Sequence, residues 1–208
     1  MRFGIEIICN FAGTMEDLKE ICVFAASSSR VAQRYVDEAY KLGREFAAAG
    51  VACINGAGRE GLMRAVSDGV LDGGGRAVGI IPQFMVDNGW QYDRLSEIVV
   101  TPDMHTRKQT MARRADAVVA LPGGCGTLEE LLEIITWKQL GLFHKPIVML
   151  NVDGFFNPLL DMLGRCVDEH FMKISHGHLW HVANDASDVL PLLASVDVYA
   201  DDMVESKY

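Results

Sequence analysis

A glycine-rich loop followed by two acidic residues is the first feature of the sequence that could do chemistry. It reads Pro122-Gly123-Gly124-Cys125-Gly126-Thr127-Leu128-Glu129-Glu130 and opens into a segment of helical period. Glycines let main-chain N–H groups approach a phosphate closely, and a helix dipole favours negative charge at its first turn. The loop lacks the Gly-Lys-Ser/Thr of a P-loop. It predicts an anion site, although Thr127 and Glu130 also have capping-box spacing, in which Glu130 would only bond to backbone.

Basic residues form a second candidate site between Met104 and Ala115, a stretch without Asp or Glu. Its cations are Arg107, Lys108, Arg113 and Arg114. Arg107 and Lys108 follow a predicted strand, where a guanidinium could hold a phosphate or carboxylate through two hydrogen bonds. In an acidic protein this is a local positive site, and the alternative is a solvated helix face.

A third motif, Gly56-Ala57-Gly58-Arg59-Glu60-Gly61, fits GxGxxG between a predicted strand and a predicted helix. That context is typical of a dinucleotide-binding loop. The ribose-binding acid expected about 20 residues later is missing, because the chain reads Gly79-Ile80-Ile81-Pro82 there. Two interpretations stay open, an NAD-dependent enzyme and a tight turn in which backbone approaches backbone or phosphate.

Two further groups of polar residues point less clearly to chemistry. His176, His178 and His181, with Asp168 or His170, could be imagined as metal ligands, but their spacing matches no usual metal site, so we expect none. Ser27 and its neighbouring serines follow the first predicted strand, where hydroxyls either bind a ligand or cap the next helix.

Strand-length apolar runs alternate with helical segments along most of the chain. The predicted strands are Glu20–Ala26, Val51–Asn55, Ala77–Ile81, Glu97–Thr101, Asp116–Leu121 and Pro146–Asn151. The predicted helices are Val31–Ala49, Gly61–Leu71, Met104–Ala115, Leu128–Gly141 and Phe155–Phe171. This order predicts a Rossmann-like, doubly wound parallel sheet with helices on both faces. Ligands bind beyond the carboxyl ends of such strands, where all three motifs lie.

Length and segment pattern predict one nucleotide-binding domain over residues 1–208. Residues 1–20 precede the first predicted strand as a possible N-terminal extension, and Met15 could be the natural start. Gln83–Ser96 has no clear period and is expected to be a long loop that carries function.

Composition limits the partners and the location. Nineteen Lys and Arg against 28 Asp and Glu give a net charge of −9, which disfavours binding to nucleic acid or anionic membranes. Phe46–Gly58, the longest stretch without charge, is shorter than the ~20 residues of a membrane-spanning helix. No secretory signal is evident, and five cysteines without a CxxC pair fit buried, reduced thiols. We therefore expect a cytoplasmic protein.

Apolar residues surround the helix that follows the glycine-rich loop, at Leu128, Leu131, Leu132, Ile134, Ile135 and Trp137. A helix that is apolar all round is buried in a core or at a subunit contact. Glu130 at its start would then be partly desolvated, which makes it a candidate for catalysis. The same pattern predicts a homodimer.

Together, Pro122-Gly123-Gly124-x-Gly126-Thr127-x-x-Glu130 and Met104-His105-x-Arg107-Lys108 resemble the paired signatures of the LONELY GUY (LOG) family. The resemblance runs from Ile21 to Phe171. It implies a Rossmann-type homodimer that hydrolyses the N-glycosidic bond of nucleoside 5′-monophosphates, giving free base and ribose 5-phosphate. The substrate would be AMP or an N6-modified, cytokinin-type nucleotide, and no cofactor or metal would be needed.

The resemblance also implies roles for individual residues. Arg107 and Glu130 match the family's catalytic pair, and Gly123, Gly124, Gly126 and Thr127 match its phosphate-binding loop, which includes Cys125. Lys108 and Glu129 match nucleotide-contacting positions. Ser27, Gly56 and Gly58, in the loops after the first two strands, complete the expected substrate-binding set.

Several positions depart from the family pattern. Ala25-Ala26-Ser27-Ser28 replaces Cys-Gly-Ser-Ser, Gly56-Ala57-Gly58 replaces three glycines, and Thr106 replaces a frequent Glu. Asn88, Gly89 and Trp90 occupy a region that often carries an acidic residue, so the preferred base stays open.

Other functions remain as alternatives. A non-catalytic carrier of a nucleotide or cofactor would use the same pocket, because a fold does not fix chemistry. Relatives often carry the label possible lysine decarboxylase, but no constellation of a Schiff-base lysine and a pyridine-nitrogen partner for PLP is evident in this sequence.

Overall fold

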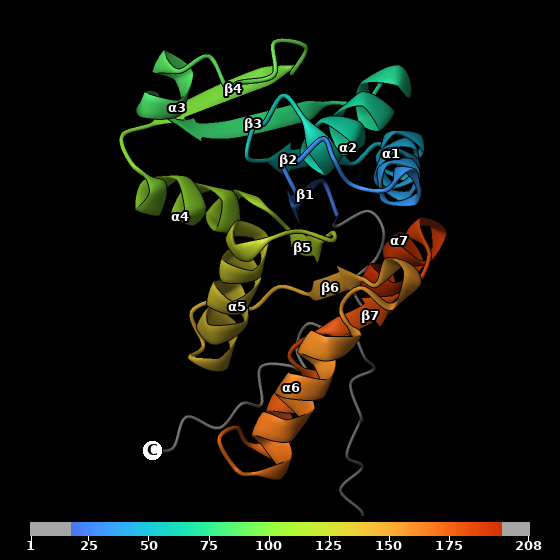
Figure 1. Cartoon of the computed structure of the whole chain (residues 1–208), viewed down its shortest axis with the longest axis vertical. Coiled ribbons are helices and arrows are strands. Elements are labelled where there is room, and N and C mark those ends of the chain that lie inside the picture. The colour runs from blue at the N-terminus through green and yellow to red at the C-terminus, as the bar shows by residue number, and fades with distance from the viewer. Residues whose placement is uncertain (1–17, 197–208) are drawn as a thin grey trace, which may run out of the picture.

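The computed structural model describes residues 18–196, which form one parallel sheet and the helices around it. The seven strands are ordered β4-β3-β2-β1-β5-β6-β7 (Figure 1). In chain order they are β1 (Glu20–Phe24), β2 (Ala52–Asn55), β3 (Ala77–Pro82), β4 (Glu97–Thr101), β5 (Ala117–Ala120), β6 (Ile147–Leu150) and β7 (His181–Ala183). In the central strand, Cys22 pairs with Ile54 on one side and Val118 on the other.

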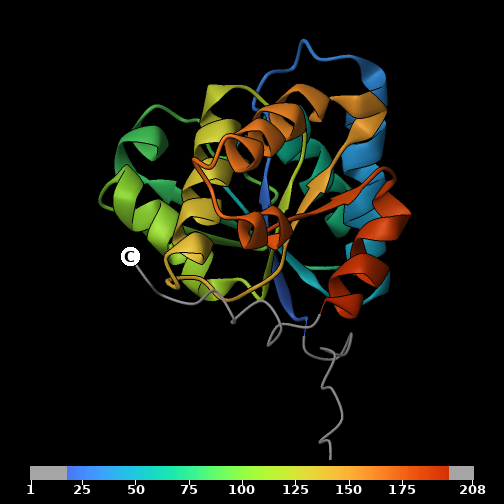
Figure 2. The ribbon, with the colours of Figure 1, turned by 90° about the horizontal axis from the view of Figure 1, so that it is seen from below.

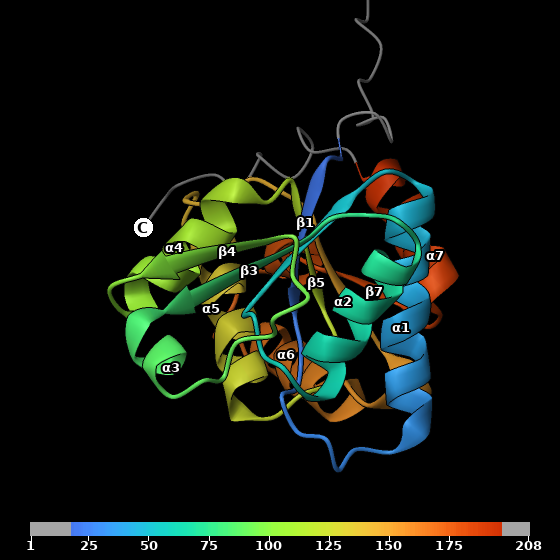
Figure 3. The ribbon, with the colours of Figure 1, turned by 90° about the horizontal axis from the view of Figure 1, so that it is seen from above.

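Helices cover both faces of the sheet, as Figures 2 and 3 show from opposite sides. One face carries α1 (Gln33–Ala48), α2 (Gly61–Asp72) and α7 (Ala186–Ser195). The other carries α4 (Met104–Arg114), α5 (Cys125–Gln139) and α6 (Asn157–Asp168). A short helix, α3 (Gln83–Asp87), and two 3-10 turns (Val152–Gly154 and Ile174–His178) lie in the connections.

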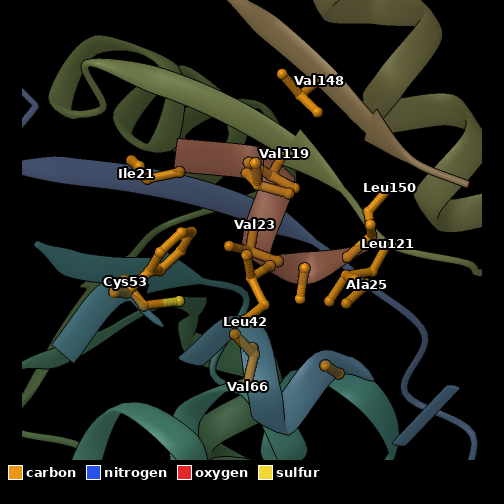
Figure 4. Close-up of a cluster of buried hydrophobic side chains, with 14 of the residues drawn as sticks. Ile21, Val23, Ala25, Leu42, Cys53, Val66, Val119, Leu121, Val148 and Leu150 are labelled. Atoms are coloured by element: carbon orange, nitrogen blue, oxygen red, sulfur yellow. The ribbon is translucent and has the colours of Figure 1, made fainter. Parts of the chain in front are cut away.

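The core explains why the strands read as continuous apolar runs. Ile21 and Val23 of β1 point into the layer formed by α1, α2 and α7 (Figure 4). Cys22 and Phe24 point into the opposite layer, against α4, α5 and α6. A parallel sheet that is buried on both faces favours near-continuous apolar runs. The predicted doubly wound fold is confirmed.

The carboxyl end of the fold was not predicted. The sequence indicates six strands, whereas the structure adds β7 and α7 after α6. β7 has three residues, too few for a periodic signal, and it is held by pairing with β6. α7 is capped by Asp185, whose side chain accepts a hydrogen bond from the Ser187 amide at 2.8 Å. Residues 1–17, including Met15, lie outside the described residues.

The chain reverses direction across the sheet at β1, which is the feature that places the site. It moves outward through β2, β3 and β4, then returns to add β5 on the other side of β1. The loops after β1 and β5 therefore start side by side, joined by the Ala26 amide and the Pro122 carbonyl at 3.3 Å. Ligands of open α/β sheets bind at such a topological switch point.

The cysteines differ in environment. Cys22 and Cys53 are buried as expected, and burial raises the pKa of Cys53 to about 12, so this thiol stays protonated. Cys125 was expected to be buried but is exposed, because it lies at the first turn of α5 beyond the sheet edge. Cys9 lies outside the described residues. Over residues 18–196, no helix is long and apolar enough to cross a bilayer.

Candidate active site

A buried ion pair between α4 and α5 is the centre of the site. Arg107 Nη1 donates to Glu130 Oε1 at 2.8 Å, and the two side chains are only 7% and 12% exposed. Arg107 Nε also donates to the Ile80 carbonyl of β3 at 3.0 Å. Burial raises the pKa of Glu130, and the Arg107 guanidinium opposes that rise. The site thus holds a desolvated carboxylate whose charged form is favoured chiefly by Arg107.

The start of α4 gives Arg107 its direction. The Asp103 side chain caps this helix by accepting from the Thr106 amide at 2.7 Å, and that contact lowers the Asp103 pKa. Arg107 lies one turn into the helix, where its side chain reaches back beneath the end of β3. Thr106, which replaces a frequent Glu in the motif, contributes its backbone amide to this cap.

The basic stretch of α4 does not form one site. Arg107 and Lys108, at its start, face α5, where Lys108 Nζ pairs with Glu129 and lies 2.9 Å from Glu133. Arg114, at its other end, pairs with Glu20 and Glu97 near the amino ends of the strands. A helix of this length separates its two ends by several turns, so the expected cluster of four cations is wrong.

Glu130 does not complete a capping box with Thr127. The residue that caps α5 is Gly124, which has no side chain, and the Gly124 carbonyl accepts from the Leu128 amide at 3.0 Å. Thr127 is buried, and a methyl group built at Gly123 would lie 2.5 Å from its Cβ. Gly123 therefore makes room for Thr127, while Glu130 is left to pair with Arg107.

Gly124 and Gly126 differ from most other glycines near the site. A methyl group built at either position meets no atom within 4 Å, so neither glycine is needed for packing within the chain. Both lie with Cys125 at the amino end of α5, a helix of 15 residues whose first N–H groups lack helical partners. The arrangement fits the predicted anion site.

The glycines of the GxGxxG motif are used by the protein itself. Gly61 has a φ of 65° and packs against the backbone of Ser27 and Ser28. The Leu62 amide, at the amino end of α2, donates to the Ala26 carbonyl at 2.8 Å. In a dinucleotide-binding loop that helix end would face a pyrophosphate. This geometry favours the tight-turn interpretation of the motif.

A pocket of about 380 Å³ opens beside Arg107. Four expected residues line it: Ser27, Gly56, Gly58 and Arg107. Six others lay outside the expected substrate-binding set: Arg59, Glu60, Met63, Ile81, Met85 and Trp90. Lys108, Glu129, Glu130 and the glycine-rich loop are not among its lining residues, although Glu130 pairs with Arg107, which is one of them.

Trp90 forms a wall of this pocket because its segment is bound to the GxGxxG loop. The Arg59 amide donates to the Trp90 carbonyl at 3.2 Å, and the Tyr92 amide donates to the Ala57 carbonyl at 2.9 Å. Phe84 of α3 packs edge-on against the Trp90 ring at a centroid distance of 6.4 Å. The Gln83–Ser96 segment, predicted as a functional loop, thus contains α3 and closes one side of the pocket.

Ser28 and His176 each accept a hydrogen bond from a nearby backbone amide. The serines after β1 do not cap α1, whose N-cap is Ala32, and Ser28 Oγ accepts from the Arg30 amide at 3.3 Å. His176 is buried, and its Nδ1 accepts from the Lys173 amide at 3.2 Å. Within residues 18–196, no group of three or more His, Cys, Asp or Glu side chains is arranged to hold a metal ion.

Comparison with known proteins identifies the family. The family model described as possible lysine decarboxylase matches residues 63–193. A probable cytokinin riboside 5′-monophosphate phosphoribohydrolase of Oryza sativa subsp. japonica is 40% identical over 98% of this chain and 82% of its own length. A cytokinin riboside 5′-monophosphate phosphoribohydrolase of Arabidopsis thaliana is 45% identical over 77% of this chain and 74% of its own length. The chain belongs to the LONELY GUY family.

Solved structures agree with this LOG fold. A structural-genomics target named TM1055 superposes with a TM-score of 0.68 at 27% identity, covering 86% of this chain and 100% of its own. The molybdenum cofactor binding protein of Rippkaea orientalis has a TM-score of 0.65 at 23% identity, covering 86% of this chain and 96% of its own. At that identity the second protein supports the fold alone.

Proposed function

We propose that this LOG protein hydrolyses the N-glycosidic bond of a nucleoside 5′-monophosphate, AMP or an N6-modified relative. The observation that carries the proposal is the buried pair of Arg107 and Glu130 at the carboxyl edge of the sheet, beside a pocket and a free helix terminus. Relatives named as cytokinin riboside 5′-monophosphate phosphoribohydrolases support the same reaction.

The reaction needs a carboxylate where Glu130 lies. Water attacks the anomeric carbon as its bond to the purine nitrogen breaks, and the electron pair of that bond leaves with the purine. Positive charge develops on the ribose, and a nearby carboxylate stabilises this charge and accepts a proton from the water. The purine takes up a proton, so the products are free base and ribose 5-phosphate.

Arg107 holds Glu130 in its charged form and supplies a cation beside the nucleotide. The N–H groups at Gly124 and Gly126 bind the phosphate, which fixes the sugar at one end. The base then lies in the pocket lined by Ile81, Met85 and Trp90. No step in this scheme calls for a metal or an organic cofactor.

The test is turnover by the purified protein. AMP and an N6-prenylated AMP are incubated with it, and chromatography measures free base and ribose 5-phosphate. The Glu130→Gln variant keeps the size of the side chain but cannot accept the proton, so we expect turnover to fall by about 10²-fold or more while AMP still binds. Wild-type activity in this variant would remove Glu130 from the mechanism.

The carrier alternative makes a different prediction in the same experiment. A non-catalytic carrier would bind AMP tightly and release neither product, with or without Glu130. Release of free base and ribose 5-phosphate by the wild-type protein therefore separates the two functions, and calorimetry shows whether AMP binds when no product appears.

We also propose a homodimer in which α5 contributes to the interface. Leu132 of this helix and Leu140 and Leu142 just after it are exposed in the single chain, although Leu131, Ile134 and Ile135 are buried against the sheet. A second copy that covered the exposed side would bury the remaining apolar residues.

A further inference from the structure

The contact between Gly56 and Arg107 points to a role for this glycine that differs from substrate binding. A methyl group built at Gly56 would overlap the Nη2 atom of Arg107 and lie 3.1 Å from its Cζ. Gly56 follows β2, whereas Arg107 belongs to α4, so the contact joins the loop after β2 to this helix.

Arg107 can move away from an added methyl group only by breaking two hydrogen bonds. Its guanidinium is held by Ile80 at Nε and by Glu130 at Nη1, on bonds of 3.0 and 2.8 Å. The residue is only 6% exposed, so no solvent-facing rotamer is available without breaking both bonds.

Gly56 has no room to retreat either. The preceding residue, Asn55, is fully buried, and its side chain donates to Ser67 Oγ at 2.8 Å. The same side chain accepts from the Ala57 amide at 2.9 Å, which fixes the backbone on both sides of Gly56. The Met63 sulfur is also close, at 3.2 Å from a methyl group built at Gly56.

We propose that Gly56 is a positioning residue, which leaves the space that the Arg107 guanidinium needs to hold Glu130. Any side chain at this position displaces Nη2 and with it the Nη1 bond to Glu130. Its effect on the reaction therefore passes through Arg107 and not through contact with the nucleotide.

A double-mutant cycle tests this role, and its kinetic arm rests on the proposed hydrolase. Gly56→Ala should lower kcat/KM on the order of 100-fold, the loss typical of removing one preorganised electrostatic contact. Arg107→Lys has no Nη2 atom, so adding Gly56→Ala to it should cost less than about threefold. Equal losses in both backgrounds would overturn the proposal, since Gly56 would then act without Arg107.

A second readout does not depend on activity. The Nε–H of Arg107 is buried and hydrogen-bonded, so it should give a slowly exchanging side-chain signal in ¹⁵N NMR, assigned by its loss in Arg107→Lys. Gly56→Ala should abolish this signal or shift it strongly, even if the protein has no hydrolase activity. An unchanged signal would overturn the positioning role.

Two control variants exclude a general effect of adding a methyl group. Gly58→Ala would meet only the Met63 side chain, whose flexible terminal methyl lies 2.6 Å away, and should retain the Arg107 signal. Gly164→Ala in α6 meets nothing within 4 Å and should leave both activity and signal unchanged. Circular dichroism and thermal unfolding confirm that Gly56→Ala is folded before its kinetics are compared.

Discussion

Among the individual residues, Glu130 gives the clearest pH dependence. A general base must be ionised, so kcat/KM should fall as the pH drops through the Glu130 pKa, which burial raises above its usual value. Arg107 opposes that rise. Arg107→Gln should therefore lower the rate and also move the acid limb of the kcat/KM profile to higher pH. A limb that stays in place or moves to lower pH would show that Glu130 is not the titrating base.

The partners of single residues were only partly predictable. The resemblance to the LOG family selected Arg107 and Glu130 as a pair, whereas spacing alone offered Glu130 a backbone partner in a capping box. That alternative is wrong because the N-cap of the helix is Gly124, three residues before Thr127. The pairing depends on how α4 and α5 lie side by side, which a local pattern does not contain.

Among the elements, α1 and α2 approach each other closely through two glycines. A methyl group at Gly69 would overlap the Tyr40 carbonyl oxygen, and one at Gly43 would lie 2.8 Å from the Val70 amide nitrogen. Gly69→Ala should destabilise the protein by about 1–3 kcal/mol, because backbone atoms cannot yield as side chains do. We expect a fall in Tm of roughly 2–4 °C for each kcal/mol.

The matched control for Gly69→Ala is Gly164→Ala, which also lies inside a helix but faces open space. There the loss of backbone freedom in the unfolded chain should raise stability by about 0.5–1 kcal/mol. Equal Tm values for the two variants would argue against close packing of α1 on α2.

The segment around Trp90 should select among substrates. Trp90 is 48% exposed and lines the pocket with Met85. If the substituent of an N6-prenylated AMP lies on this wall, Trp90→Ala should raise KM for that nucleotide on the order of tenfold more than for AMP, from a lost apolar contact of about 1–3 kcal/mol. Phe84→Ala removes a neighbour of Trp90 that does not line the pocket. It should produce a smaller difference between the KM values for the two nucleotides. Equal changes in KM for both nucleotides would exclude Trp90 from selectivity.

The elements with long periodic patterns were well predicted, and the short elements were not. Long apolar runs and helical periods located β1 to β6, and the strand ends indicated the edge where ligands bind. The pocket wall was harder, because α3 has five residues and the Trp90 segment is placed by two backbone bonds, from Arg59 to Trp90 and from Tyr92 to Ala57, which depend on no particular side chain. β7 and α7 were missed for a related reason, since pairing with β6 and packing on α1 define them.

For the whole molecule, the proposed dimer can be tested by mass. Light scattering at micromolar concentration should give twice the mass of one chain. Leu132→Glu places a charge on the exposed side of α5 and should shift the protein to monomer. Phe171→Glu changes an equally apolar but more exposed residue after α6 and should leave the dimer intact. A monomeric wild-type protein would refute the proposal.

The single antiparallel bridge described between Gly58 and Gln91 has a consequence for exchanging parts between relatives. The segment 83–96 is also anchored to α2, since the Tyr92 hydroxyl bonds to Asp68 and Arg94 Nη2 lies 2.9 Å from Asp72. If segment 83–96 alone were moved into a relative, Tyr92 and Arg94 would lose their partners Asp68 and Asp72 on α2. We therefore expect substrate preference to transfer between LOG proteins only when segment 83–96 is exchanged together with the face of α2 that carries Asp68 and Asp72.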